Sequence, residues 1–462
     1  MSKTPICDFV DNYAKSGTVR AHMPGHKGAA FLGCEARDIT EICGADELYG
    51  ASGIIKKSER IASEIFGTGE TYYSTEGSSL CIRAMLFLAL MNAKERGSAG
   101  KTVLAGRNAH KTLISAAALL DLDIEWLYQS ENSESGANES LLSCIIDEET
   151  LENALSRANE KPIAVYITSP DYLGNIANIA ALAGICKAHG APLIVDNAHG
   201  AYLRFLKPNL HPIALGADMC CDSAHKTLPC ITGAAYLHIN TEAPKLFSEM
   251  AEKALALFAS TSPSYLILQS LDVFNGLCGA GYERRLELAA QRIEKLKQKL
   301  EGFGYALIGS ERLKLTLAPK SIGYTGHELA EYLRKNGVEC EFADPDFTVL
   351  MLSMQTGEAG LEQIEKKLLS IEKRAPIAQK PPRLARLERA LSAREAVLAP
   401  QEQVALENAS GRILALDHCA CPPAVPIAIA GERLDETAIE CLKYYGISAV
   451  SAVKKEFYRL EE

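Results

Sequence analysis

Short apolar runs alternate with segments of helical period from about residue 70 onward. The apolar runs are four to six residues long, end in or are followed by a polar or glycine residue, and lie at residues 72–75, 102–105, 163–168, 192–196 and 217–222. Apolar residues recur at helical spacing between them, at residues 58–66, 80–92, 151–158 and 179–189. Alternation of strands and helices predicts an α/β fold with a mostly parallel, doubly wound sheet.

The pattern changes beyond residue 280, where a long charged amphipathic helix is expected to leave the large domain. A second α/β pattern follows, then a stretch rich in proline and lysine, then a tail with its own helices. We expect a fold-type I arrangement divided into an N-terminal arm (1–60), a large domain (61–290), a small α/β domain (291–374), a linker (375–384) and a C-terminal α+β domain (385–462).

Composition narrows the class of protein. The chain has 462 residues, 47% hydrophobic and 23% charged, which is typical of a soluble globular protein. A net charge of −10 disfavours nucleic-acid and membrane partners. No apolar run approaches 18 residues and the N-terminus lacks a signal peptide, so we expect fourteen free cysteines in a reducing cytoplasm. Cys419 and Cys421, next to His418, suggest zinc, but no second ligand pair follows, and we expect no metal.

Two polar side chains follow neighbouring apolar runs. Asp196 ends one run, and Lys226 follows the next in a loop of small and polar residues. Because the carboxyl ends of parallel strands meet at one edge of a sheet, both should face one crevice. A lysine that forms a Schiff base and an aspartate for a pyridinium nitrogen are what pyridoxal 5′-phosphate (PLP) requires. A solvated surface lysine is commoner in general, but this loop favours a PLP enzyme.

Further groups at strand ends fit the same cofactor. Residues 77–79 (GSS) begin a helix and offer backbone N–H groups and two hydroxyls to a phosphate, although serines there are also ordinary caps. His110 follows another strand and is a candidate to stack on the ring; a capping role is the alternative. Ser223 and His225 stand close enough to Lys226 to donate to the phosphate.

The order of these motifs resembles the fold-type I, PLP-dependent ornithine/lysine/arginine decarboxylase family, in a short form without the N-terminal wing domain. The matching stretches lie at residues 24–28 (PGHKG), 76–79 (EGSS), 108–111 (NAHK), 196–200 (DNAHG), 223–228 (SAHKTL), 261–265 (TSPSY), 391–396 (LSAREA), 422–426 (PPAVP) and 431–432 (GE). They are specific for the family and not for the substrate.

The resemblance implies a role for each of these residues. Lys226 is the Schiff-base lysine, Asp196 binds the ring nitrogen, His110 stacks on the ring and His199 lies near ring and substrate. The residues implied at the phosphate and cofactor are Glu76, Gly77, Ser78, Ser79, Ser223, His225, Ser262 and Ser264. The last two belong to a segment similar to one that reaches a neighbouring subunit's cofactor, which implies a homodimer or higher oligomer with shared sites. His26 and Glu432 are the candidates for binding substrate.

Three departures from the family pattern stand out. Asn197 replaces an expected glutamate, and Glu76 replaces an asparagine or threonine, where a carboxylate beside a phosphate must point away. Residues 421–424 (CPPA) replace Tyr-Pro-Pro-Gly, and we expect Ala424 to lose access to positive φ and to re-aim a possible substrate loop.

The sequence therefore predicts PLP-dependent decarboxylation of a cationic amino acid, arginine or lysine before ornithine, to an amine of the kind used in polyamine synthesis. One alternative is a PLP aminotransferase or lyase, which usually carries a carboxylate-binding arginine in its small domain. Arg334 is the obvious candidate, and its exposure to solvent would weaken this alternative. The other alternative is a non-catalytic regulatory homologue with a decayed substrate pocket.

Overall fold

The computed structural model describes residues 3–129, 140–279, 281–417 and 424–458. They form two compact units. The first comprises Met1–Gly100, Ile163–Ser169 and Asn178–Leu288, and the second comprises Lys101–Pro162, Pro170–Ala177 and Ala289–Glu462. The five domain boundaries expected from the sequence remain predictions.

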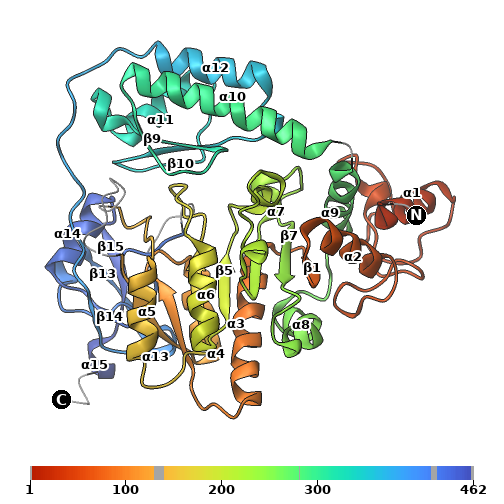
Figure 1. Cartoon of the computed structure of the whole chain (residues 1–462), viewed down its shortest axis with the longest axis horizontal. Helices are drawn as coiled ribbons and strands as arrows, with labels where there is room; N and C mark the ends of the chain where they lie inside the picture. The colour runs from red at the N-terminus through yellow and green to blue at the C-terminus, as the bar shows by residue number, and fades with distance from the viewer. Residues whose placement is uncertain (1–2, 130–139, 280, 418–423, 459–462) are drawn as a thin grey trace. The chain divides into compact units, whose positions relative to one another are not determined.

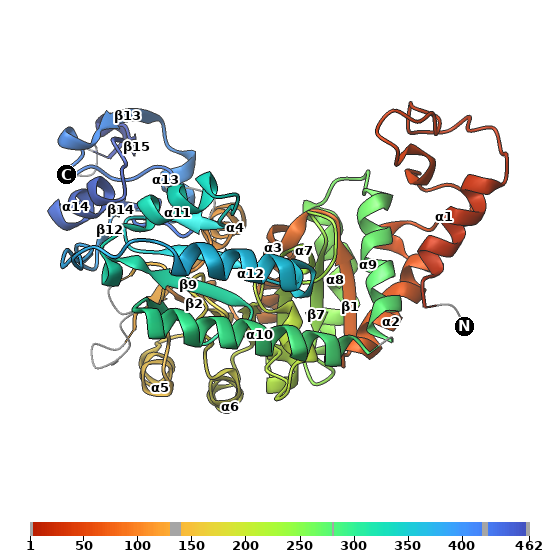
Figure 2. The same cartoon turned by 90° about the horizontal axis from the view of Figure 1, so that it is seen from above.

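The first unit is a layered α/β structure. Its strands lie in the order β1 (Glu70–Ser74), β7 (Ala235–Ile239), β6 (Met219–Asp222), β5 (Leu193–Asp196) and β4 (Ala164–Thr168). Its helices are α1 (Pro5–Lys15), α2 (Ile54–Phe66), α3 (Gly77–Glu95), α6 (Ile179–His189), α7 (Ala224–Thr227), α8 (Lys245–Phe258) and α9 (Tyr265–Cys278). Helices α3 and α6 cover opposite faces of the strands, and α1, α2 and α9 pack together near β1 (Figures 1 and 2).

Strand direction brings several loops of this unit to one edge. Strands β4, β5 and β6 are parallel, whereas β7 is antiparallel to both β6 and β1. The fold class expected from the sequence is confirmed, and β7 is its antiparallel exception, because the chain turns back directly after the short helix α7. Since β1 runs in the same direction as β5 and β6, the chain after Ser74, Asp196 and Asp222 emerges at a shared edge.

The second unit contains smaller sheets. The strands are β2 (Thr102–Gly106), β3 (Asp123–Leu127), β8 (Ala306–Ile308), β9 (Lys314–Ala318), β10 (Phe342–Ala343), β11 (Thr348–Met351), β12 (Glu388–Arg389), β13 (Gln401–Ala405), β14 (Glu432–Arg433) and β15 (Ala449–Val453). The helices are α4 (Lys111–Leu120), α5 (Glu148–Arg157), α11 (Gly326–Lys335), α12 (Gly357–Leu369), α13 (Ala393–Leu398), α14 (Glu436–Tyr444) and α15 (Lys455–Tyr458), and the long α10 (Tyr282–Phe303) enters it from the first unit.

Pairing in the second unit is mostly antiparallel. Strands β10-β11-β9-β8 form one antiparallel sheet, with α10, α11 and α12 on one side of it (Figure 1). Strand β12 pairs with β14 and β13 with β15, and a buried apolar cluster that includes Val404, Leu434 and Leu442 forms a core there. Among the described residues, no helix combines the length and apolar character needed to cross a bilayer.

Candidate active site

Asp196 is the last residue of β5 and is 3% exposed. Its Oδ2 accepts a hydrogen bond from the Tyr166 hydroxyl on β4 at 3.0 Å. Its Oδ1 accepts from the Ala198 backbone N–H at 3.2 Å and from the Cys221 thiol at 3.6 Å. Burial raises the pKa of Tyr166 well above its usual value, and the Asp196 charge adds to this, so the hydroxyl remains a donor. Three uncharged donors therefore fix the carboxylate.

Lys226 and His199 face each other across the turns that follow β6 and β5. Lys226 lies in α7, and its Nζ is 3.0 Å from Nε2 of His199. Whenever Lys226 donates this hydrogen bond, Nε2 is the accepting nitrogen of a neutral imidazole and the ring proton lies on Nδ1. The geometry thus pairs a primary amine with a proton acceptor at the same edge as Asp196.

The start of α3, which is expected to bind a phosphate, contacts the loop after β6. The Ser223 hydroxyl donates to the Ser78 hydroxyl at 2.9 Å, which joins the loop after β6 to this helix. Gly77 N donates to Gly233 O at 2.8 Å, and a Cβ on Gly233 would lie 2.9 Å from the carbonyl oxygen of Thr75. Only glycine fits at position 233, because a side chain would prevent this loop from lying so close to the start of α3. Ser79 occupies the next position of the same helical turn.

Glu76, the N-cap of α3, pairs with a backbone N–H outside this helix. Its Oε1 accepts a hydrogen bond from the Ser260 backbone N–H at 2.7 Å. The carboxylate therefore orders the segment before α9, in which Ser262 is exposed and Ser264 is the N-cap of α9. The departure from the family pattern at position 76 is thus compatible with phosphate binding.

His225 has a defined tautomer. Its Nδ1 is 3.0 Å from the Ala234 carbonyl oxygen, which can only accept, so Nδ1 carries a proton. Nε2 of His225 can then donate to a phosphate only if the ring is a doubly protonated imidazolium. His26, in the N-terminal arm, lies 3.2 Å from Asp38 Oδ2 through Nε2 and accepts from Gly28 N through Nδ1. Both ring nitrogens of His26 are thus engaged within the arm.

His110 belongs to the second unit, where it is the N-cap of α4. Its Nδ1 accepts from the Thr112 backbone N–H at 3.1 Å. The next residue, Lys111, donates its backbone N–H to Ala424 O at 2.8 Å. Ala424 has φ of 57°, so the expectation that this position loses the left-handed conformation is wrong. Burial of Ala424 and this hydrogen bond hold the alanine in it. Residues 418–423, which include Cys419 and the first three residues of the altered motif (421–423), lie outside the described residues.

Glu432 is also part of the second unit and is 6% exposed. Its Oε2 lies 3.5 Å from Nη2 of Arg107 and accepts from the Ile429 backbone N–H at 2.8 Å. Arg107 also donates to the carbonyl oxygens of Pro426 and Ile427. Burial raises the pKa of Glu432 and the Arg107 charge opposes this. Glu432 and Arg107 therefore fasten the tail to the loop that carries His110.

The first-unit groups fit PLP on chemical grounds. A carboxylate without a cationic partner among the described residues, a primary amine and a helix N-terminus with two serines occur at one sheet edge. These match the ring nitrogen, the aldehyde carbon and the phosphate of that cofactor.

Comparison with known proteins agrees with this geometry. Residues 4–315 match the family model described as Orn/Lys/Arg decarboxylase, major domain, and residues 378–457 match its C-terminal domain. The chain belongs to the Orn/Lys/Arg decarboxylase family. As a member of it, the protein is a decarboxylase of a basic amino acid, and the PLP fold is that of the family.

Two curated relatives match almost the full length of this decarboxylase. It is 28% identical to an arginine decarboxylase of Bacillus subtilis, over 95% of this chain and 92% of the relative. It is 27% identical to an arginine decarboxylase of Halalkalibacterium halodurans, over 96% and 93%. The solved constitutive lysine decarboxylase of E. coli shares the fold, with a TM-score of 0.74 and 17% identity over 98% of this chain and 82% of that one.

Two residues that contact predicted site residues were not themselves predicted. Tyr166 sits in the otherwise apolar run of β4, and a buried tyrosine hydroxyl needs a partner, which is a signal that the sequence carried. Arg107 directly follows β2, and a cation at a strand end close to His110 was a similar signal. Its partner Glu432 could be found only from the fold.

Proposed function

We propose that this decarboxylase removes the carboxyl group of arginine or lysine, in preference to ornithine, and releases the corresponding amine and CO2. The observation that carries the proposal is the meeting of Lys226, His199 and Asp196 at one edge of the sheet, on turns after β5 and β6. Curated relatives named arginine decarboxylase support arginine as the first candidate. A cytoplasmic location and a role in polyamine synthesis are part of the same proposal.

The residues that would hold PLP have separate tasks. Lys226 Nζ would bind the aldehyde carbon, Asp196 would accept the ring N–H, and Ser78, Ser79 and Ser223 would donate to the phosphate. When bound, PLP withdraws electrons from the substrate's Cα, which makes loss of CO2 possible. His110 is proposed to stack on the ring, and His225 to donate to the phosphate as an imidazolium.

The protein's own groups then manage protons and orientation. His199 Nε2 lies 3.0 Å from Lys226 Nζ, so it can take the proton that the Lys226 ammonium must lose before its amine can bind the aldehyde carbon. After CO2 has left, the same lysine and histidine can return a proton to Cα. Fixed donors align Asp196, so its carboxylate would accept the ring N–H of the cofactor in a defined orientation.

Subunit sharing and substrate contacts are further parts of the proposal. Ser262 is exposed and its neighbour Ser264 begins α9, which suits a segment that reaches a second copy of the chain. We therefore propose a homodimer or higher oligomer. His26 remains a substrate-binding candidate, and Glu432 is better suited to fix the tail, because Arg107 already pairs with it.

The aminotransferase alternative loses its candidate arginine. The side chain of Arg334 is 60% exposed and pairs with Glu339. A solvated, paired guanidinium is a weak ligand for a substrate carboxylate.

Product analysis tests the proposal. Purified protein with PLP is given arginine, lysine and ornithine separately, and CO2 and the three amines are quantified. We expect one amine from the wild type, none from Lys226→Ala, and wild-type levels from Lys187→Ala, which removes an exposed lysine paired with Glu242. If the wild type binds PLP and yields no amine, the proposal is wrong and a non-catalytic homologue is favoured.

A further inference from the structure

A buried carboxylate joins the two turns that carry the main site residues. Asp222 ends β6, directly before Ser223, and it has no exposed surface. The side-chain amide of Asn197, the residue after Asp196, donates to Asp222 Oδ1 at 2.6 Å. The backbone N–H of Asn197 donates to Cys221 O at 3.0 Å, and its carbonyl oxygen accepts from Gly200 N at 2.8 Å. Asn197 therefore anchors the turn between Asp196 and His199 at three points.

Two imidazoles hold the other oxygen of Asp222. Nε2 of His211 and Nε2 of His238 donate to Oδ2 at 3.1 and 3.2 Å, and His238 Nδ1 pairs with the Thr71 hydroxyl of β1 at 2.9 Å. Burial lowers the pKa of His238, so this ring is neutral and donates from Nε2. Burial alone would raise the pKa of Asp222, but His211 and His238 outweigh it and keep that pKa well below its usual range. The network thus spans β1, β7, β6 and β5.

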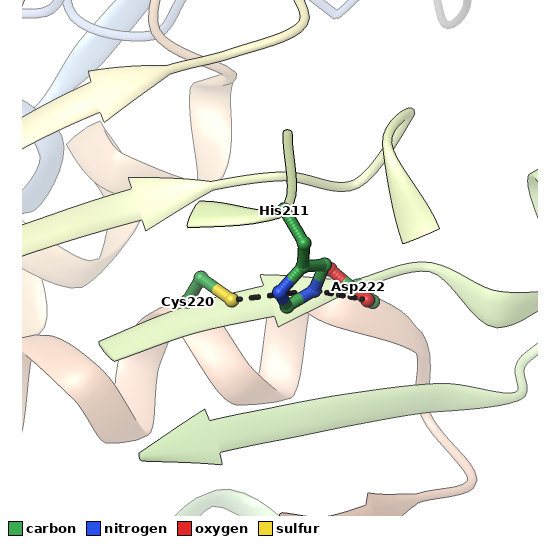
Figure 3. A group of neighbouring side chains, drawn as sticks. All are labelled: His211, Cys220 and Asp222. Carbon is green, nitrogen blue, oxygen red and sulfur yellow. Dashed lines mark hydrogen bonds and ion pairs between the residues drawn. The ribbon is translucent and has the colours of Figure 1, made fainter. Parts of the chain in front are cut away.

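The same cluster contains residue types that bind transition metals. His211, Cys220 and Asp222 point toward one another (Figure 3), and Sγ of Cys220 lies 3.9 Å from Nε2 of His211. Burial raises the pKa of the Cys220 thiol well above its usual value, which opposes the thiolate that a metal requires. The hydrogen bonds to Asp222 already account for the short distances. We therefore interpret the cluster as a hydrogen-bond network.

We propose that Asp222 is a positioning residue for the cofactor site, which acts through Asn197. The Asn197–Asp222 hydrogen bond fixes the turn of Asp196 and His199 against the turn of Ser223 and Lys226. The proposal rests on the proposed function only in requiring that these turns bind PLP. It also explains the departure at position 197, because a glutamate there would place a second carboxylate against Asp222.

The hydrogen bond should tolerate an exchange of the two residues, Asn197 and Asp222, but not a carboxylate at both positions. Asn197→Asp removes the donor and adds a buried negative charge, and we expect it to weaken PLP binding by at least about tenfold and to shift the absorption band of the bound cofactor. The double variant Asn197→Asp/Asp222→Asn restores one donor and one acceptor. We expect its PLP affinity to return to within about threefold of the wild type. PLP titration followed by absorbance measures both quantities.

A matched control separates positioning from general stability. Asp218 lies just before β6, and its Oδ2 accepts from Leu193 N at 2.8 Å, at the end of the strands opposite the site. Asp218→Ala removes this acceptor, and should lower the melting temperature of the cofactor-free protein but leave PLP affinity and the absorption band unchanged. If Asn197→Asp does not fold, Asn197→Ala deletes the bond without a second charge, and should weaken PLP binding several-fold.

Three outcomes would overturn the inference. Wild-type PLP affinity and spectrum in both Asn197→Asp and Asn197→Ala would remove the positioning role, and a double variant no better than Asn197→Asp would remove the pairing. A stoichiometric metal whose chelation abolishes PLP binding would replace the network with a metal site. Because the readout is PLP binding, a wild type that binds PLP without producing amine contradicts the proposed function and leaves this inference standing.

Discussion

Two buried carboxylates, Asp196 in the first unit and Glu432 in the second, are stabilised in different ways. Asp196 accepts hydrogen bonds only from uncharged groups among the described residues, the Tyr166 hydroxyl, a backbone N–H and a thiol. Glu432 lies 3.5 Å from the Arg107 guanidinium, which is itself 9% exposed. Both carboxylates were predicted as site residues, Asp196 for the cofactor and Glu432 for the substrate.

This difference in partners suits Asp196 to binding a ligand and Glu432 to holding the protein's own segments together. A buried carboxylate held by neutral donors still attracts a cation, such as a protonated ring nitrogen. A carboxylate whose charge is matched by a buried guanidinium gains little from a second cation and loses much if the pair is broken. We infer that Asp196 serves the cofactor, and that Glu432 mainly holds the tail against the loop of Arg107 and His110.

Removing the charge of Asp196 should have the largest effect. Asp196→Asn keeps the shape but removes the charge and turns one accepting oxygen into an amide donor, so the ring nitrogen loses its acceptor and kcat/KM should fall by about 10³-fold. Steady-state amine production measures it. Asp218→Asn is the control and should retain activity. A loss of less than about tenfold in Asp196→Asn would contradict the assigned role.

Neutralising Glu432 should act on stability instead. Glu432→Gln leaves the Arg107 guanidinium buried without its partner, and we expect urea denaturation to show a loss of about 2 kcal/mol. Arg107→Met combined with Glu432→Gln should cost less than the sum of the single changes. The ratio of activities on arginine and lysine should not change. A changed ratio with normal stability would return Glu432 to the substrate pocket.

The comparison also shows how far the sequence reaches. Strand–helix alternation and strand-end motifs predicted the α/β fold and the grouping of Asp196 and Lys226 at one edge, because both follow from local pattern and the geometry of parallel strands. The antiparallel direction of β7 was not predicted, since it depends on how the chain turns after α7. The left-handed Ala424 also went against local preference, because a long-range hydrogen bond to Lys111 decides it.

The sequence also did not predict which side chains pair with each other. Asn197 and Asp222 are 25 residues apart, and neither motif indicates that one donates to the other. The Arg107–Glu432 pair joins positions that only the folded second unit brings together. Motifs thus identified the site residues, whereas the charges and donors that surround them required the fold.

The close approach of Gly233 to Thr75, near Ser78, tests the cofactor-binding role of the first unit. Gly233 has φ of 95°, and an added Cβ would meet the Thr75 carbonyl oxygen at 2.9 Å. Gly233→Ala should cost roughly 2 kcal/mol in urea denaturation and weaken PLP binding. Gly67→Ala is the control, because Gly67 also has positive φ, at 71°, but nothing lies within 4 Å of its Cβ position. It should cost about 1 kcal/mol and spare PLP binding. Equal costs would show that the close approach is unimportant.

The smallest effect is expected at Asp417, a carboxyl close to Arg107 and Glu432 in the second unit. Its pH dependence tests how that neighbourhood stabilises buried carboxylates. Burial raises the pKa of Asp417 to about 6, with Arg107 opposing and Glu432 adding to the rise. A carboxyl whose folded pKa lies above its unfolded value, about 4, stabilises the fold at low pH and loses that contribution as pH rises through 6. Asp417→Asn cannot ionise, so its stability relative to the wild type should improve by about 1–2 kcal/mol between pH 4 and pH 8.

Asp435 provides a control of opposite sign within the same unit. Hydrogen bonds at the N-terminus of α14 lower the pKa of Asp435, despite some burial, and its side chain accepts from Ala438 N. A carboxyl with a lowered pKa stabilises the fold at pH values above its unfolded pKa. The free energy of unfolding of Asp435→Asn should therefore fall relative to the wild type as pH rises from 3 to 6. If both variants change in the same direction, net charge rather than the Arg107 neighbourhood governs the response. If the two variants change in opposite directions, the local surroundings of each carboxyl govern the response. For Asp417 these surroundings are burial and the charge of Glu432, which Arg107 only partly offsets.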